Sequence, residues 1–271
     1  MKKNRLTVSG IFKGLFIGAV IFIIYLPILI IFGLSIDSSR TGNSFTGITF
    51  DWYKEIFTNK SLYMSIITSF AVALSATCIS AFFGTFAAIG IHTLSRKAKE
   101  KVILLNNIPV LNAEIVTGIS IMIICSFLIP LIPDFFGYWT MLIAHIFFTM
   151  PYVILSVLPK LNELDPNLYD ATTDLGVRPL RALFKIVIPG IETGIISGVL
   201  LAFTLSIDDF VISYFTSGNG ITNFSNWIYV RLGRRNFTPA AYAFNSLLTI
   251  VILLVVFIPQ FKKGKKKAIK N

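Results

Sequence analysis

The sequence predicts an all-α protein that crosses a membrane several times, and three observations support this class. Of the 271 residues, 55% are apolar or aromatic and only 14% are charged. The mean hydropathy is +0.77, well above that of ordinary soluble domains. The apolar residues also gather in runs of roughly twenty, which is the length that a helix needs to cross a bilayer. This composition argues against a soluble globular domain.

Six apolar runs are long enough to be spanning helices. The first follows Lys2, Lys3 and Arg5, as in a signal peptide, but it is too long and no small-residue cleavage site follows it. We therefore expect a retained signal anchor. The six runs define a transmembrane domain of residues 14–261 between basic tails of residues 1–13 and 262–271. The predicted spans are residues 14–34, 66–91, 115–132, 141–158, 194–215 and 240–261.

The basic residues predict the orientation, because basic loops resist translocation. With a cytoplasmic N-terminus, eighteen of the 24 Lys and Arg residues lie inside, in the two tails and in the second-to-third and fourth-to-fifth loops. Both termini and the loop of residues 159–190 are therefore predicted to be cytoplasmic. The net charge of +11 reflects this topology, since no soluble basic face interleaved with aromatics suggests nucleic-acid binding. Three of the six basic residues predicted to lie outside form a cluster at 231–235, which goes against the cytoplasmic bias. The six are Arg40, Lys54, Lys60, Arg231, Arg234 and Arg235.

The loop between the fourth and fifth spans carries signals for two short helices. Asp165 suits an N-cap, Pro166 suits the first helical position, and Gly176 suits the residue just past the end. A second helix can start at Pro179, and Pro189 marks the break before the fifth span. Such amphipathic helices either pack on lipid headgroups and the protein's own bundle, or dock into a cytoplasmic partner.

This loop resembles the coupling loop of the membrane subunits of bacterial ABC importers, whose pattern is E-A-A-x3-G-x9-I-x-L-P. The chain has Asp-Ala-Thr, three residues, Gly, nine residues, Ile, one residue and Ile-Pro, so every spacing matches. Asp for Glu, Thr for the second Ala and Ile for Leu are conservative departures. The resemblance implies contact with an ATPase subunit through Asp170, Ala171, Thr172, Gly176, Ile186, Ile188 and Pro189.

Three further stretches are similar to the second permease subunit of spermidine/putrescine importers: "LLAFTLSIDDFVISYFTSG", "AHIFFTMPYVILSVLPKL" and "TPAAYAFNSLL". This resemblance implies a six-helix ABC importer permease that forms half of a translocation pathway in the bacterial inner membrane. It also implies a homologous permease, two copies of an ABC ATPase and an extracytoplasmic polyamine-binding protein as partners. Another small cation or a metal chelate is the alternative cargo, and an ion-gradient transporter or a membrane scaffold is the alternative class.

No motif for catalysis or for phosphate binding occurs in the sequence. A G-x-x-x-x-G-K-[ST] loop is absent, so ATP and Mg are expected on the partner ATPase and no cofactor is expected on this chain. Cys78 and Cys125 lie in apolar runs and indicate no metal site. His92 and His145 are far apart, and we expect His145 to be a hydrogen-bonded packing residue in preference to a ligand. The sequence therefore predicts a transport subunit and no enzyme.

Three acidic residues lie in or at the ends of apolar spans, where a carboxylate is costly unless it meets water or a partner. Asp208 and Asp209 lie inside the fifth run, and Glu114 opens the third. One interpretation is that they attract a cation along a pathway. The other is structural, with one aspartate capping a helix break or pairing with an arginine of a neighbouring chain.

A repeat of small residues marks one face of the fifth span. Gly190, Gly194 and Gly198 recur at every fourth position, so a neighbouring helix can approach closely there. The contact is expected either within the bundle or with the paired permease.

Overall fold

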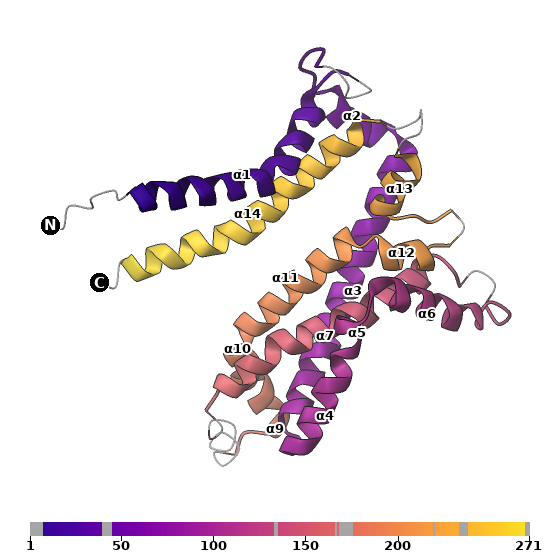
Figure 1. The fold of residues 1–271 in the computed structure, drawn as a ribbon. Coiled ribbons are helices and arrows are strands. Elements are labelled where there is room, and N and C mark those ends of the chain that lie inside the picture. Colours follow the sequence, from indigo (N-terminus) through magenta and orange to yellow (C-terminus); the bar gives the residue numbers. More distant parts are fainter. Residues whose placement is uncertain are drawn as a thin grey trace. The chain divides into compact units, whose positions relative to one another are not determined.

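The computed structural model is helical, apart from turns and loops, throughout the residues that it describes (Figure 1). These are residues 8–39, 45–132, 135–165, 167, 176–218, 220–232 and 238–268. An isolated bridge between Asp37 and Ile48 is the only β pairing within those ranges. The chain forms two compact units, one of Met1–Tyr63 with Arg231–Asn271 and the other of Met64–Val230.

The first unit brings the two ends of the chain together. It contains α1 (Val8–Ile36), α2 (Asp51–Thr58) and α14 (Ala240–Ala268). Helices α1 and α14 run side by side (Figure 1). The Tyr53 hydroxyl of α2 lies 3.0 Å from Ser35 Oγ and 3.2 Å from Ser246 Oγ, so it links all three helices. Apolar side chains of α1 such as Ile23 are exposed, as expected for a helix that faces lipid.

The second unit contains most of the helices and the deepest packing. Helices α7 and α11 make its most extensive contact among the described elements. Val153 and Val157 of α7 pack with Ala202 of α11 and Ala88 of α3, and all four are buried. Its helices are α3 (Lys60–His92), α4 (Arg96–Asn106), α5 (Ile108–Leu111), α6 (Glu114–Ser126), α7 (Tyr138–Glu163), α9 (Pro179–Ala182), the π-helix η1 (Leu183–Val187), α10 (Ile188–Gly190), α11 (Glu192–Asp208), α12 (Val211–Thr216) and α13 (Phe224–Arg231).

The glycine repeat lies against α7, within this chain. A Cβ atom on Gly194 would lie 2.9 Å from the carbonyl oxygen of Ser156, and one on Gly198 would lie 3.1 Å from the Cα of Val153. A Cβ on Gly190 would lie 2.6 Å from Leu164 Cδ2. Because backbone atoms cannot move aside, the missing side chains are what allow α11 to approach α7. The glycine face therefore packs within the bundle, against α7, which is the first of the two contacts expected from the sequence.

The described helices match the predicted spans in part. Three are long and apolar enough to cross a membrane: Lys13–Ile36, Lys60–His92 and Tyr138–Glu163. Two further pairs pass the same test only when joined across sharp bends: Arg96–Leu111 with Glu114–Ser126 at 99°, and Pro179–Gly190 with Glu192–Asp208 at 70°. In the last helix, α14, the apolar segment that can be assessed is Ala240–Leu254, which is shorter than a full span. The count of six spans therefore stays a prediction.

The third and fifth predicted spans are wrong as single straight helices. In the third, residues 115–132, helix α6 ends at Ser126 and turns follow it. Pro130 lies in those turns, and proline has no backbone N–H with which to continue a helix. In the fifth, residues 194–215, α11 ends at Asp208 and α12 begins at Val211. Hydropathy alone does not detect such breaks, because the residues on both sides are apolar.

Candidate functional site

The loop predicted to couple to an ATPase is described at its two ends. The Asp165 carboxylate accepts a hydrogen bond from the backbone N–H of Asn167 at 2.9 Å, as an N-cap does. Three of the predicted coupling residues, Asp170, Ala171 and Thr172, lie outside the described residues. The second half of the loop is described from Gly176 onward.

Gly176 adopts the left-handed conformation predicted for it, with φ +82°. No heavy atom of the described residues lies within 4 Å of a Cβ built there, and the left-handed backbone conformation is what favours glycine. Further along, Ile186 falls in the π-helix η1, and Ile188 and Pro189 begin α10. The turn and the break before the fifth span are thus both present.

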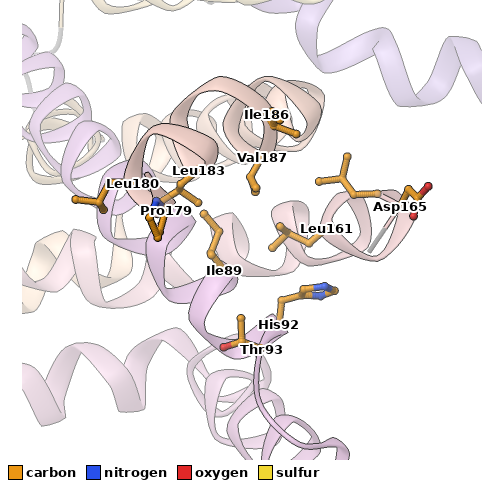
Figure 2. A pocket seen from close by; sticks show the side chains of 11 residues that line it. Ile89, His92, Thr93, Leu161, Asp165, Pro179, Leu180, Leu183, Ile186 and Val187 are labelled. Carbon is orange, nitrogen blue, oxygen red and sulfur yellow. The ribbon is translucent and has the colours of Figure 1, made fainter. Parts of the chain in front are cut away.

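An apolar cavity of about 450 Å³ lies where the two ends of this loop meet α3 (Figure 2). Figure 2 shows Ile89 of α3, Leu161 of α7, and Leu183 and Val187 of η1 converging on the same space. Ile186, one of the predicted coupling residues, also lines it. The segments before and after the loop therefore share one apolar lining with α3 and α7.

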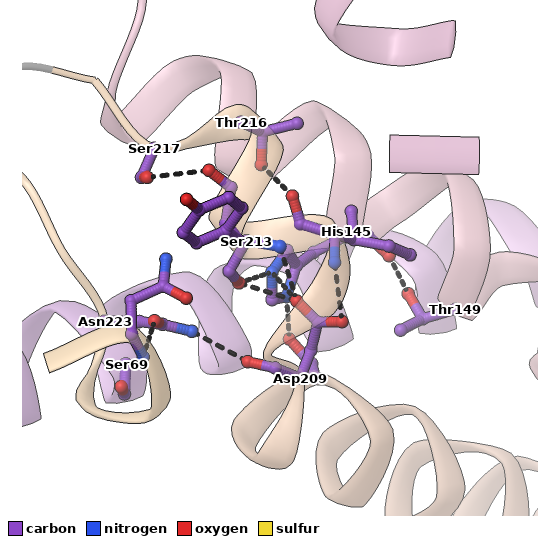
Figure 3. Close-up of polar contacts among 12 residues, drawn as sticks. Ser69, His145, Thr149, Asp209, Ser213, Thr216, Ser217 and Asn223 are labelled. Carbon is purple, nitrogen blue, oxygen red and sulfur yellow. Dashed lines mark hydrogen bonds and ion pairs between the residues drawn. The ribbon is translucent and has the colours of Figure 1, made fainter. Parts of the chain in front are cut away.

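A buried polar cluster at the other end of the second unit centres on His145 of α7 (Figure 3). The ring is 1% exposed. Its Nδ1 lies 2.6 Å from Ser206 Oγ of α11, and its Nε2 lies 2.9 Å from Ser213 Oγ of α12. Thr149 donates to the His145 carbonyl oxygen at 2.6 Å and lies 2.8 Å from Ser80 Oγ of α3. The expectation of a hydrogen-bonded packing histidine is confirmed, and the cluster ties four helices together.

Asp209 occupies the break between α11 and α12. Its Oδ1 accepts from Ile212 N at 3.2 Å, and its Oδ2 accepts from the N–H and the hydroxyl of Ser213 at 2.7 and 2.6 Å. His145 Nε2 lies 3.5 Å from the same Oδ2, and the Asn223 side chain donates to the Asp209 carbonyl oxygen at 2.8 Å. Figure 3 shows the contacts of Ser213 and His145 meeting at the carboxylate and the contact of Asn223 at the backbone carbonyl oxygen. The arrangement is that of a carboxylate capping the first turn of a helix.

Asp208 and Glu114 lie at a second cavity of about 400 Å³. Both residues are exposed, whereas Asp209, which also belongs to the lining, is 8% exposed. Aromatic side chains share this wall with the carboxylates, namely Phe148, Tyr152 and Phe210. Carboxylates and aromatic faces both attract ammonium groups. The three acidic residues predicted from sequence are thus brought to one cavity, with two of them open to it.

The residues that sequence reasoning missed are the partners of the aspartates. Ser206, Asp209 and Ser213 are spaced by three and four residues, and His145 and Thr149 are four apart. Both spacings place polar groups on one face of a helix. Polar residues at these spacings within apolar runs were therefore a usable signal for a buried network. The spacing within one segment does not, however, identify the other segment with which its polar residues form hydrogen bonds.

Comparison with known proteins gives consistent results over most of the chain. The sequence model of a family described as "Binding-protein-dependent transport system inner membrane component" matches residues 81–261. The spermidine/putrescine transport system permease protein PotC of Haemophilus influenzae is 30% identical over 237 residues, covering 88% of this chain and 90% of that protein. The putrescine transport system permease protein PotI of Escherichia coli is 31% identical over 255 residues, covering 92% and 90%.

The fold is also similar to a solved structure. A chain of a bacterial ABC transporter involved in the import of the acidic polysaccharide alginate superposes with a TM-score of 0.65, covering 97% of this chain and 98% of that one. The two sequences are only 13% identical. This likeness supports the fold.

Proposed function

Because this chain belongs to the family of inner membrane components of binding-protein-dependent transport systems, we propose that it carries polyamines such as spermidine and putrescine across the cell membrane as a permease subunit of an ATP-driven importer. The observation that carries the proposal is the similarity to PotC and PotI over about nine tenths of each chain. The homologues are transport subunits, in keeping with a chain that performs no chemistry of its own.

The cavity at Asp208 and Glu114 supports a cationic cargo. Both carboxylates are exposed beside Phe148, Tyr152 and Phe210. A polyamine carries several ammonium groups separated by apolar methylene chains, and it needs this mixture of anionic and apolar surface. The same lining also suits another small organic cation, which remains the second candidate cargo.

The loop of residues 159–190 is the proposed contact with a separate ATPase, which would hold ATP and Mg. Gly176 supplies the turn, and Ile186, Ile188 and Pro189 lie where the chain re-enters the bundle. Closure of two ATPase copies would then move the loop, and the apolar lining at Ile89 and Leu161 would pass that movement to α3 and α7. A homologous permease would supply the other half of the pathway, and an extracytoplasmic protein would deliver the polyamine. Both termini would be cytoplasmic.

The test is uptake of radiolabelled spermidine by cells that lack only this chain. Uptake should be lost and should return with the wild-type gene. As a control, the deletion strain is also complemented with a plasmid that encodes Gly176→Val. This variant should insert into the membrane but transport poorly, so it shows that insertion of the chain alone does not restore uptake. Competition with unlabelled putrescine and with an inorganic cation separates the polyamine from the other candidate cargoes. Normal spermidine uptake in the deletion strain, with no second spermidine importer present, overturns the proposal.

A further inference from the structure

The hydrogen-bond directions in the buried cluster assign one proton. Ionised Asp209 can only accept, so the Ser213 hydroxyl donates its single hydrogen to Oδ2 at 2.6 Å. Ser213 Oγ can then only accept from His145 Nε2 at 2.9 Å, which places a proton on Nε2. The other ring nitrogen, Nδ1, lies 2.6 Å from the Ser206 hydroxyl. Ser206, His145, Ser213 and Asp209 thus form one hydrogen-bonded relay.

The carboxylate of Asp209 is buried, and both of its oxygens are held by groups of the protein itself. Oδ1 is engaged by Ile212 N, and Oδ2 by two groups of Ser213. Its backbone is extended at φ −63° and ψ 128°, and its carbonyl oxygen accepts from Asn223. Asp208, one residue earlier, is the last residue of α11 and is exposed at the cavity. Asp209 therefore lies at the break directly after Asp208, and the hydrogen bonds that hold Asp209 fix the backbone on the C-terminal side of Asp208.

We propose that His145 is a positioning residue for cargo recognition, acting through Ser213 and Asp209 to aim Asp208 at a multiply charged ammonium cargo. The inference rests on the proposed function, because it states which of the two adjacent aspartates meets the polyamine. Asp208 with Glu114 forms the cation-recognising pair, and Asp209 holds the break. His145 does not touch the cargo and binds no metal in this role.

The cargo arm of the test is a double-mutant cycle on selectivity. Maximal uptake of spermidine and of putrescine, which differ by one ammonium group, is measured per assembled transporter for wild type, His145→Ala, Asp208→Asn and the double variant. Each single variant should lower the spermidine-to-putrescine ratio by about fivefold, less than the loss of spermidine uptake itself, because putrescine also loses a contact with the carboxylate. The double variant should be no lower than Asp208→Asn alone, because a misaimed carboxylate and an absent one are equivalent. Multiplied effects of about 25-fold overturn the proposal.

Two further variants separate positioning from folding. Ser213→Ala removes only the middle of the relay and should lower the ratio as His145→Ala does. His145→Gln, a neutral amide that can donate to Ser213, should recover at least half of the lost ratio. The matched control is Thr216→Val, which is buried on the same helix and donates its hydroxyl to the Ile212 carbonyl outside the relay; its ratio should stay within twofold of wild type. A glutamine variant no better than alanine overturns the hydrogen-bond relay.

A stability arm needs no cargo. The melting temperature of the purified transporter is compared for His145→Ala, Asp209→Asn and both together. The two single decreases should add to more than the decrease in the double variant, because each breaks the same network. Additive decreases overturn the relay. If the wild-type transporter takes up neither polyamine, the proposed function fails and the role of Asp208 fails with it, while this arm still decides whether His145 and Asp209 act together.

Discussion

Asp208 and Asp209 are chemically identical neighbours with opposite surroundings. The first is exposed beside a cavity with Glu114, and the second is 8% exposed and accepts three hydrogen bonds through its carboxylate. An uncompensated carboxylate in an apolar span costs about 2.5–3.5 kcal/mol on insertion scales. Hydrogen bonds from the first turn of α12 offset that cost for Asp209. Contact with water or with a cation in the cavity is what remains for Asp208.

Asparagine at these two positions should therefore produce different defects. Asp208→Asn should lower spermidine uptake per folded transporter about tenfold or more, since a charge-assisted hydrogen bond contributes about 1.5–3 kcal/mol. Its melting temperature and basal ATP hydrolysis should stay normal. Asp209→Asn should lower the melting temperature, because asparagine keeps only one acceptor oxygen, so either the Ile212 N–H or the two donors of Ser213 face an NH₂ group.

Glu192→Gln is the matched control for charge removal. Glu192 is exposed at the opposite end of α11 and does not line the cavity. Its uptake and melting temperature should match those of wild type. Unchanged uptake per folded transporter in Asp208→Asn would eliminate a cation-pathway role for that residue.

Gly194 should tolerate no side chain. A Cβ there would lie 2.9 Å from the carbonyl oxygen of Ser156 and 2.9 Å from Lys160 Cγ. Since the carbonyl belongs to the α7 backbone, Gly194→Ala should force the two helices apart and destabilise the protein by about 1–3 kcal/mol. Thermal unfolding of the purified protein measures this effect. Gly90→Ala is the control, because no atom of the described residues lies within 4 Å of its Cβ. Alanine at this helical position should be neutral or stabilising by up to about 1 kcal/mol. Equal melting temperatures for the two variants would contradict the close contact.

Single-residue predictions from sequence succeeded where local chemistry decides the outcome. Gly176 has the left-handed backbone expected of a residue past a helix end, and His145 is a hydrogen-bonded packing residue. The roles of the aspartates could not be separated, because the partners of Asp209 come from α7, α12 and the segment before α13. Sequence spacing within one span carries no information about which of two adjacent carboxylates turns inward.

At the scale of helices, hydropathy located apolar segments better than it located their ends. The predicted runs at 66–91 and 141–158 fall within α3 and α7. The run at 194–215 extends across α11 and α12, which are separated at Asp209. An apolar average over about twenty residues hides one polar residue that ends a helix by capping the next. The aspartates inside the run were the only local signal of that break.

The turn at Gly176 is the element whose failure should uncouple transport from ATP hydrolysis. Gly176→Val requires a β-branched residue in the left-handed region, at a cost of at least about 1–2 kcal/mol, although no atom of the described residues lies within 4 Å of its Cβ. The ATPase should co-purify poorly or hydrolyse ATP without uptake. Gly176→Asn is the control, because asparagine tolerates this conformation and should retain most of both activities. Normal co-purification and transport in the valine variant would show that the turn is not needed for coupling.

For the whole molecule, composition and basic-residue distribution predicted a multi-pass membrane protein, and membership of an inner-membrane family agrees with it. The number of spans is harder to predict from the sequence, because two segments are bent by 99° and 70°. A bent segment either crosses the bilayer as a broken span or re-enters from one side, and each choice reverses the side of every later loop. Orientation therefore has to be measured on loops before and after these bends.

Three exposed basic positions make that measurement possible for the first bend. Lys54 lies on α2, Lys97 on α4 and Arg181 on α9, with the first bend between the last two. Each is replaced by cysteine, one at a time, in a chain whose own Cys78 and Cys125 have been changed to serine. Because all three side chains are exposed, reactivity with an impermeant thiol reagent reports the side of the membrane and not burial. Cysteine at Lys54 should react in intact cells.

Cysteines at Lys97 and Arg181 should react only after permeabilisation, because eighteen of the 24 basic residues were assigned to the cytoplasm with these two among them. Labelling at Arg181 in intact cells, with Lys97 protected, would mean that the chain changes sides an odd number of times between them. The loop at Gly176 would then lie outside, where no ATPase can reach it, and the coupling role would fall with the topology. Protection of both positions places the loop on the side where ATP is available, which coupling requires.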